Sequence, residues 1–166
     1  LSEGSRAIVN GWDTHAHVID QRFPLWAGRG YEPPHAPLDK YLEFLDRYGF
    51  APGVLVQPSV YGFDNRCMLD ALERADGRLR GIAVPPPDAD ARAFEAMHNA
   101  GVRGVRCNVL NAGGLKLEQV LPWTSVMREL GWHVELHAHA QHIDLREWAE
   151  RIEVPPHGVR CGPVKP

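Results

Sequence analysis

Short apolar runs alternate along the chain with stretches whose apolar residues recur at helical spacing. Strands are predicted over 7–13, 53–57, 79–84, 101–108 and 132–138, and helices over 40–48, 64–75, 88–99, 118–129 and 143–151. Glycine or proline stands at most of the junctions, and both residue types end regular structure. Because short strands alternate with longer helices, the pattern predicts an α/β fold built on a parallel sheet.

Five such strands suit either a doubly wound sheet or the first part of a (β/α)8 TIM-type barrel. No glycine-rich dinucleotide-binding fingerprint follows the first strand, so that version of the doubly wound sheet has no support. Polar residues instead gather where successive strands end: His15 and His17, Gln57 and Ser59, Arg106 and Asn108, His137 and His139. Barrel enzymes build their active sites at this end of the strands.

The length of the chain limits how much of a barrel it can form. A complete barrel takes about 250 residues, and the chain has 166. No stretch resembles an interdomain linker. We therefore expect a single domain over 1–166, with an irregular tail over 152–166, and the residues alone leave the type of sheet open.

The first predicted strand ends in the most distinctive motif, Asp-Thr-His-Ala-His. Side chains two residues apart on a strand point to the same face, so Asp13, His15 and His17 are expected to line up. Two neighbouring imidazoles form either half of a metal site or a pair that handles protons and binds anions. The residues alone leave both alternatives open.

The fifth predicted strand has one apolar face and one face rich in histidine. The apolar positions are Trp132, Val134, Leu136 and Ala138, and the polar positions are His133, Glu135, His137 and His139. His137 lies near the end of the strand and could join His15 and His17 in a cluster of three imidazoles. We expect His133 and His139 to be solvated or locally hydrogen-bonded, and His98 to lie on the surface.

Several further side chains could hold a ligand at the strand ends. The Arg106 guanidinium could clamp a carboxylate through two parallel hydrogen bonds, and Asn108 lies two residues further on. Ser59 either donates a hydrogen bond to the same ligand or serves the turn after a proline. Tyr31, in a long loop rich in proline and glycine, either closes over a pocket or packs on its rim. Asn65 either caps the next helix or faces the site.

Composition narrows the choice of partners. The formal net charge is -3 and the pI is about 6.3, so neither nucleic acid nor an anionic membrane is an expected partner. No apolar run reaches the ~20 residues of a membrane span. The three widely spaced cysteines, Cys67, Cys107 and Cys161, indicate reduced thiols and a cytoplasmic protein.

Four motifs together resemble the amidohydrolase superfamily, in the branch that contains 2-pyrone-4,6-dicarboxylate lactonase. The motifs span 13–17, 57–65, 101–108 and 131–137, and the resemblance runs from about residue 8 to residue 149. It implies a (β/α)8 TIM-type barrel, of which this incomplete domain contains only about the first five βα units. The activity it implies is hydrolysis of a small carboxylated lactone by an activated water. It also implies a divalent metal, zinc by expectation, and leaves a homo-oligomer open.

The resemblance assigns roles to individual residues. His15 and His17 match the catalytic first-strand pair, which binds metal in most of the superfamily and contacts substrate in the pyrone lactonase. His137 matches a fifth-strand metal ligand, and Tyr31, Ser59 and Arg106 match positions that hold the substrate, with Asn108 counted beside them. The pyrone lactonase has tyrosine at the fifth-strand position, so the histidine here favours the metal-using members.

Two departures from the family pattern qualify these expectations. Ala112 stands where the pyrone lactonase has a second arginine, which argues against a dicarboxylate substrate. The family's general-base aspartate lies on strand eight, beyond the end of this sequence. We therefore expect a truncated form, with weak or absent activity and poor solubility. The alternatives are a decarboxylase on the same kind of barrel and a non-catalytic fragment that binds metal or a partner.

Overall fold

The computed structural model describes residues 11–110, 114–139, 141, 143–152 and 156–161. Its strands are β1 (Gly11–Ala16), β2 (Phe50–Val56), β3 (Leu79–Ala83), β4 (Val102–Asn108), β5 (His133–Ala138) and β6 (Pro156–Cys161). Its α-helices are α1 (Leu38–Tyr48), α2 (Arg66–Arg74), α3 (Ala91–Asn99), α4 (Thr124–Glu129) and α5 (Leu145–Ile152). Short 3-10 turns are η1 (Ser59–Tyr61), η2 (Leu117–Gln119) and η3 (Leu121–Trp123).

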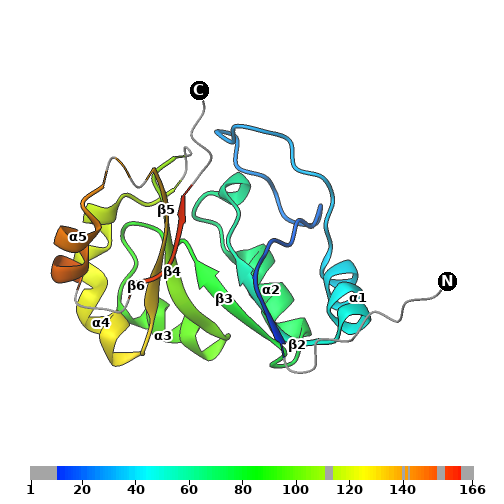
Figure 1. The fold of residues 1–166 in the computed structure, drawn as a ribbon. Coiled ribbons are helices and arrows are strands. Elements are labelled where there is room, and N and C mark those ends of the chain that lie inside the picture. The colour runs from blue at the N-terminus through cyan, green and yellow to red at the C-terminus, as the bar shows by residue number, and fades with distance from the viewer. Residues whose placement is uncertain (1–10, 111–113, 140, 142, 153–155, 162–166) are drawn as a thin grey trace.

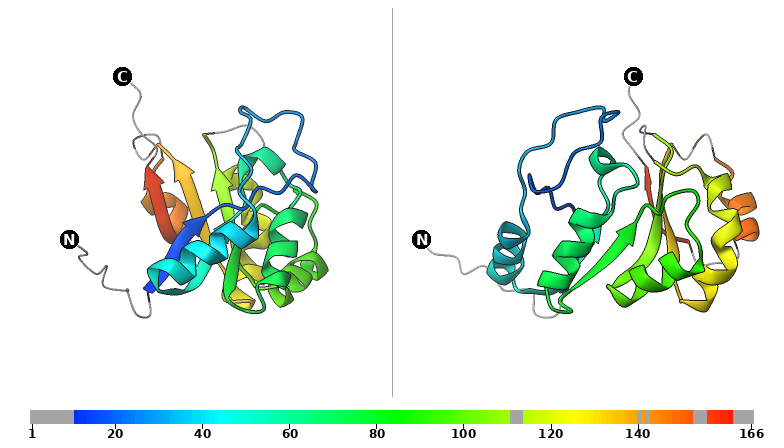
Figure 2. Two further views of the ribbon diagram at one scale, coloured as in Figure 1. Left: turned by 90° about the vertical axis from the view of Figure 1, so that its right-hand side faces the viewer. Right: turned by 180° about the vertical axis from the view of Figure 1, so that it is seen from behind.

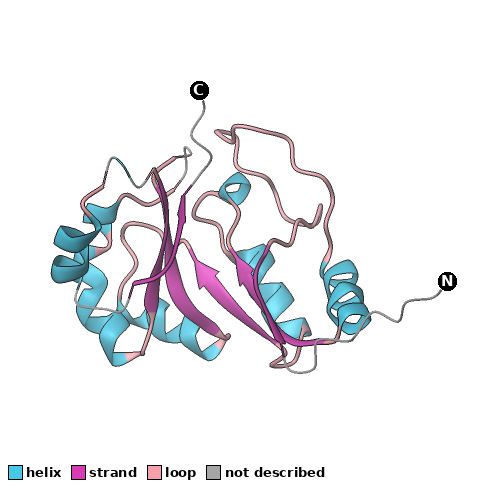
Figure 3. Cartoon of the chain, in the orientation of Figure 1, coloured by secondary structure: helices cyan, strands magenta, loops and turns pink. Residues whose placement is uncertain are grey.

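The described strands form one parallel sheet in the order β1-β2-β3-β4-β5-β6. Since every strand pairs with the next one along the chain, the connections do not reverse direction as they do in a doubly wound sheet. The helices cover one face of the curved sheet (Figures 1 and 3). The edge strands β1 and β6 lie on the same open side (Figure 2). The predicted partial barrel is confirmed.

The irregular tail predicted over 152–166 is wrong where the sixth strand forms. β6 pairs with β5 in parallel, with Leu136 opposite Val159 and Ala138 opposite Cys161. The backbone of β5 offers a row of hydrogen-bonding groups to any neighbouring segment, whether or not that segment alternates apolar and polar side chains. Residue 152 ends α5, and 153–155 and 162–166 lie outside the described residues.

The helix predicted over 118–129 is also different in the structure. Two 3-10 turns, η2 and η3, precede a short α-helix that begins only at Thr124. Pro122 lies at the start of η3, where its missing N–H prevents a continuous helix from passing through.

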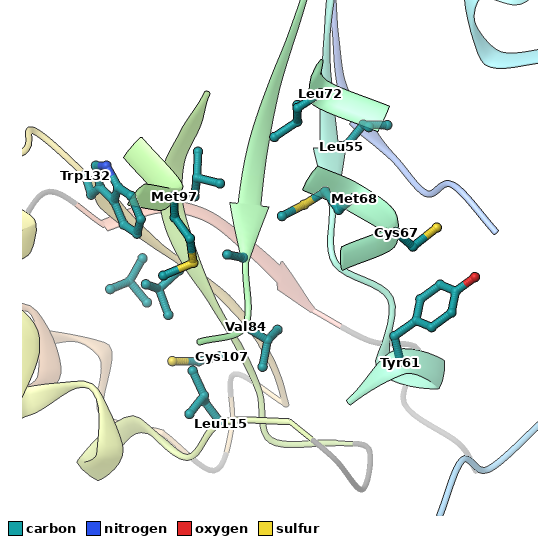
Figure 4. Packing of buried hydrophobic residues seen from close by; sticks show 14 of the residues in the cluster. Leu55, Tyr61, Cys67, Met68, Leu72, Val84, Met97, Cys107, Leu115 and Trp132 are labelled. Atoms are coloured by element: carbon teal, nitrogen blue, oxygen red, sulfur yellow. The ribbon is translucent and has the colours of Figure 1, made fainter. Parts of the chain in front are cut away.

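The core lies between the sheet and its helices. Met68 and Leu72 of α2 point toward the sheet (Figure 4), where Gly81 of β3 has no side chain in their way. A Cβ at Gly81 would lie 2.8 Å from a methyl of Leu72. This close approach packs α2 against the convex face of the sheet, which the helices cover. The opposite, concave face carries the polar side chains described below.

His98 is part of this packing and does not sit free on the surface as expected. Its Nδ1 accepts a hydrogen bond of 3.0 Å from the Trp132 indole N–H, and the two rings stack. Trp132 is buried at 1% exposure, so its N–H needs a partner. Among the described helices, none is long and apolar enough to cross a membrane.

Candidate active site

His15 of β1 and Glu135 of β5 meet across the open side of the curved sheet. His15 Nδ1 lies 3.4 Å from Glu135 Oε2, and both side chains are about nine-tenths buried. β2, β3 and β4 stand between these two strands in the sheet, so the contact cannot follow the ladder. It crosses the concave face and places both residues on the inner surface of the partial barrel.

Arg106 of β4 joins this pair. It is only 6% exposed, its Nε lies 3.8 Å from Glu135 Oε1, and its Nη1 donates to the Gln57 carbonyl at 3.3 Å. A buried guanidinium stays charged and therefore needs acceptors around it. The Gln57 carbonyl, just after β2, supplies one acceptor, and the nearby carboxylate of Glu135 offsets the positive charge, which holds the fork at the carboxyl ends of the strands.

His17 follows β1 and is bound to the end of β2. Its Nδ1 lies 2.7 Å from the Val56 carbonyl oxygen, and its ring centroid lies 4.9 Å from that of His15. A carbonyl only accepts, so Nδ1 must carry the proton and Nε2 is left as an acceptor.

The surroundings of His17 also favour its neutral form. Desolvation lowers the pKa of His17 to about 4, and the positive charge of Arg106 acts in the same direction. Part of the residue still faces solvent. At neutral pH this imidazole is uncharged.

Asp13 does not share the face of the two histidines. The β1–β2 register is irregular on both sides of Asp13, which lies opposite Gly53. A Cβ at Gly53 would point at the Tyr41 hydroxyl of α1, and the carboxylate of Asp13 adds to burial in raising the pKa of Tyr41. The predicted alignment of three side chains is therefore wrong for Asp13, because the irregular register turns it toward the helix side.

Asn108 and His137 lie side by side at the ends of β4 and β5. They are partners in the ladder, and the Val109 N–H donates to the His137 carbonyl at 3.1 Å. Asn108 is 4% exposed, and its Oδ1 accepts from the Leu110 N–H. Arg106 and Glu135 are partners two residues earlier in the same ladder, so all four belong to one end of the sheet.

The predicted metal ligands do not form a metal centre. Within the described part of the chain, no group of three or more His, Cys, Asp or Glu is arranged to hold a metal ion. His15 Nδ1 faces Glu135, and His17 Nδ1 faces a carbonyl. His137 does not complete a set with them. The His15, His17 and His137 cluster expected from the sequence therefore does not fit a metal as these residues stand.

The remaining candidates occupy the loops at the same end of the sheet. Ser59 begins η1, just after β2. Tyr31 is half exposed, at 51%, in the loop between β1 and α1, which arches above the strand ends (Figures 1 and 2). Asn65 is structural: its amide donates to the Val84 carbonyl and accepts from the Val84 N–H. It neither caps α2 with its side chain nor faces the histidines.

Glu135 is the residue whose importance sequence reasoning missed. The alternation of β5 placed it on the polar face but gave it no role. A carboxylate between two histidines on the lumen side of a strand was the available signal, because a buried carboxylate requires cationic or N–H partners. Those partners come from β1 and β4, and only the curvature of the sheet brings them together.

A curved parallel sheet with polar side chains at its carboxyl edge defines an enzyme-type (β/α) barrel domain. Residues 12–154 match the amidohydrolase family model, and the chain belongs to that family. The resemblance seen in the sequence motifs is therefore confirmed.

Individual relatives are lactone hydrolases by name. The 4-sulfomuconolactone hydrolase of Rhizobium radiobacter is 39% identical over 139 residues, which cover 80% of this chain and 46% of the relative. The 2-pyrone-4,6-dicarboxylate hydrolase of Comamonas testosteroni is 34% identical over 143 residues, which cover 81% of this chain and 45% of the relative. The chain spans about half the length of these relatives.

Solved structures agree with the sequence relatives. A structure from Acinetobacter baumannii, described as a probable 2-pyrone-4,6-dicarboxylic acid hydrolase with citric acid bound, is 32% identical with a TM-score of 0.72. The alignment covers 81% of this chain and 51% of that one. An apo structure from Agrobacterium tumefaciens has a TM-score of 0.79 at 17% identity and supports the fold alone.

Proposed function

We propose that the chain binds a small anionic lactone at the carboxyl ends of its strands and takes part in hydrolysis of the ring ester. The observation that carries this proposal is the buried Arg106, held beside Glu135 and His15. Arginine recognises planar anionic groups through paired hydrogen bonds. The names of the relatives specify lactones with a sulfo group or two carboxylates, which is the chemistry such a guanidinium recognises.

The reaction adds one water across the ring ester. The water oxygen bonds to the lactone carbonyl carbon, the ring carbon–oxygen bond breaks, and the ring oxygen receives a proton. Arg106 holds the anionic group and thereby orients the carbonyl. His17, neutral with Nδ1 protonated, presents Nε2 as a hydrogen-bond acceptor for a water or a substrate hydroxyl. His15 borders the same space.

The family resemblance also suggests a divalent metal, and zinc is the specific proposal. The three histidines do not form a ligand set in the described residues, so we assign no step to a metal. The assays below are therefore run both with and without added zinc, and atomic absorption of the purified chain measures what it retains.

The test compares two conservative arginine variants. Arg106→Lys keeps the charge but loses the fork, whereas Arg92→Lys alters an exposed arginine of α3. Calorimetric titration with a carboxylated lactone and with a sulfonated lactone should show weaker binding by about tenfold or more for Arg106→Lys only. Equal binding by both variants and the parent chain would contradict the assignment of Arg106.

Turnover separates the proposed reaction from its main competitor. Loss of the lactone ring absorbance reports hydrolysis, and release of carbon dioxide reports the alternative, a decarboxylase. We expect ring opening, at a rate below that of the longer relatives. Turnover at the rate of these relatives would contradict the expected weakness. Release of carbon dioxide would replace lactone hydrolysis by decarboxylation as the proposed reaction. A cytoplasmic location is also part of this proposal. It is supported by Cys67 and Cys107, which are free, buried thiols, because thiols stay reduced in that compartment.

A further inference from the structure

Glu135 contacts two functional candidates that come from different strands. One carboxylate oxygen lies 3.4 Å from His15 Nδ1 of β1. The other lies 3.8 Å from Arg106 Nε of β4. The residue is 7% exposed, so the carboxylate is largely removed from water.

We propose that Glu135 is the positioning residue of this site, fixing the orientation of the His15 imidazole relative to the Arg106 guanidinium. The proposal rests on the proposed lactone hydrolysis, in which Arg106 holds the anionic group of the substrate and His15 borders the reacting ester. A carboxylate that touches both sets the spacing between the two ends of the substrate.

The chemistry of the carboxylate determines what His15 can do. An ionised carboxylate accepts hydrogen bonds and cannot donate one. In the proposed arrangement the His15 nitrogen that faces the carboxylate carries the proton, which directs Nε2 away from Glu135. Histidines at catalytic sites are commonly oriented in this way by a carboxylate on the other ring nitrogen.

The position of Arg106 is set from two sides. Arg106 and Glu135 are direct partners in the β4–β5 ladder, and the other end of the fork donates to the Gln57 carbonyl of the segment after β2. His15 has no such ladder link to β5, because β1 lies at the other edge of the sheet. The contact with Glu135 is therefore what ties the orientation of His15 to that of Arg106.

The alternative is that Glu135 only neutralises the buried charge of Arg106. Loss of the carboxylate would then weaken folding or substrate binding without changing the His15 ring. The two roles differ in their effect on the state of His15 and in whether kcat or KM changes.

The experiment uses the 166-residue chain with Glu135→Gln, which preserves size, and Glu135→Asp, which preserves charge. Glu95→Gln, on the exposed side of α3, is the matched control. A long-range proton–nitrogen correlation spectrum reports the protonation of each His15 nitrogen. We expect Nδ1 to be protonated in the parent chain, to change in Glu135→Gln, and to remain protonated in Glu135→Asp and Glu95→Gln.

Kinetics with a carboxylated lactone provide the second readout. We expect Glu135→Gln to lower kcat by about 10- to 100-fold with a change in KM of about twofold or less, and Glu135→Asp to restore part of the loss. An unchanged His15 spectrum in folded Glu135→Gln, or a loss confined to KM, would overturn the proposal.

Two outcomes remain decisive if a measurement fails. Should Glu135→Gln not fold, an unprotonated Nδ1 on His15 of the parent chain would overturn the proposal and a protonated one would support it. Should the parent chain not hydrolyse any lactone, the proposed reaction fails, while the spectrum still decides whether Glu135 orients His15.

Discussion

The two histidines at the end of β1 are held by different kinds of acceptor. His17 faces the backbone carbonyl of Val56, and His15 faces the carboxylate of Glu135. A carbonyl has no charge to offset that of an imidazolium, whereas a carboxylate has. The pair is therefore electrostatically unequal, although the sequence presents the two residues as equivalent.

The low pKa of His17 predicts how the free energy of unfolding depends on pH. The pKa of His17 is about 4 in the folded chain and 6.5 in the absence of its surroundings, chiefly because of desolvation, with Arg106 and His15 adding to the shift and Val56 and Glu135 opposing it. As the pH falls below about 6.5, the unfolded chain takes up the proton first, so folding stability declines toward pH 4. His17→Gln should remove part of that decline.

Chemical denaturation at intervals between neutral pH and pH 4 measures the effect. His35→Gln, an exposed histidine in the loop before α1, serves as the control and should keep the slope of the parent chain. Identical slopes for the parent chain and His17→Gln would show that His17 does not contribute.

Single residues were predictable from sequence where the strand pattern alone placed them. His15, His17 and Arg106 could be found because each follows or ends an apolar strand. The contact between Glu135 and His15 could not be predicted. It joins β5 to β1 only because the sheet is curved, and the periodicity of the sequence does not report that curvature. Asp13 was misplaced since an irregular register reverses the face of a side chain.

At the scale of elements, the bounds of helices and strands were predictable to within a few residues where glycine or proline flanked a regular apolar pattern. α1, α3 and β3 lie close to their expected bounds. The segment before α4 was not predicted correctly, because Pro122 interrupts the helix and 3-10 turns form instead. β6 was not, since pairing with β5 depends on backbone groups that carry no sequence signal.

The end of β4 offers a test at the scale of an element. Gly114 follows the loop after β4, and a Cβ there would clash with the backbone carbonyl and the side chain of Asn108. Backbone atoms cannot give way as a flexible side chain can, so Gly114→Ala should destabilise the chain by about 1–3 kcal/mol. Urea denaturation measures this loss.

Gly30→Ala is the matched control for that substitution. No heavy atom lies within 4 Å of the Cβ it would introduce, so its stability should remain close to that of the parent chain. A loss of the same size in both variants would indicate a general effect of replacing loop glycines and would contradict the role of the Asn108 contact.

At the scale of the whole molecule, the sheet of the described residues does not close. β1 and β6 are its edges, and edge strands offer backbone groups to another chain. Trp12 of β1 is 51% exposed and adds apolar surface to one of them. The barrel type was favoured because four of the five predicted strands carry polar residues at the same end, whereas the sequence did not indicate what covers the edges of the sheet.

We expect the purified chain to self-associate through these edges. Trp12→Lys should weaken the association by about tenfold, since it removes apolar area and places charge on an edge strand. Analytical ultracentrifugation over a range of concentrations measures the change. Tyr31→Ser removes an aromatic side chain of equal exposure from the loop and should have no effect; a monomeric parent chain would contradict the expectation.

The distance between His15 and Glu135 also depends on the curvature of the sheet. The contact joins two strands that share no ladder, so its length changes whenever the sheet opens or tightens. A change in the curvature of the sheet would therefore change the spacing between His15 and the groups of β4 and β5.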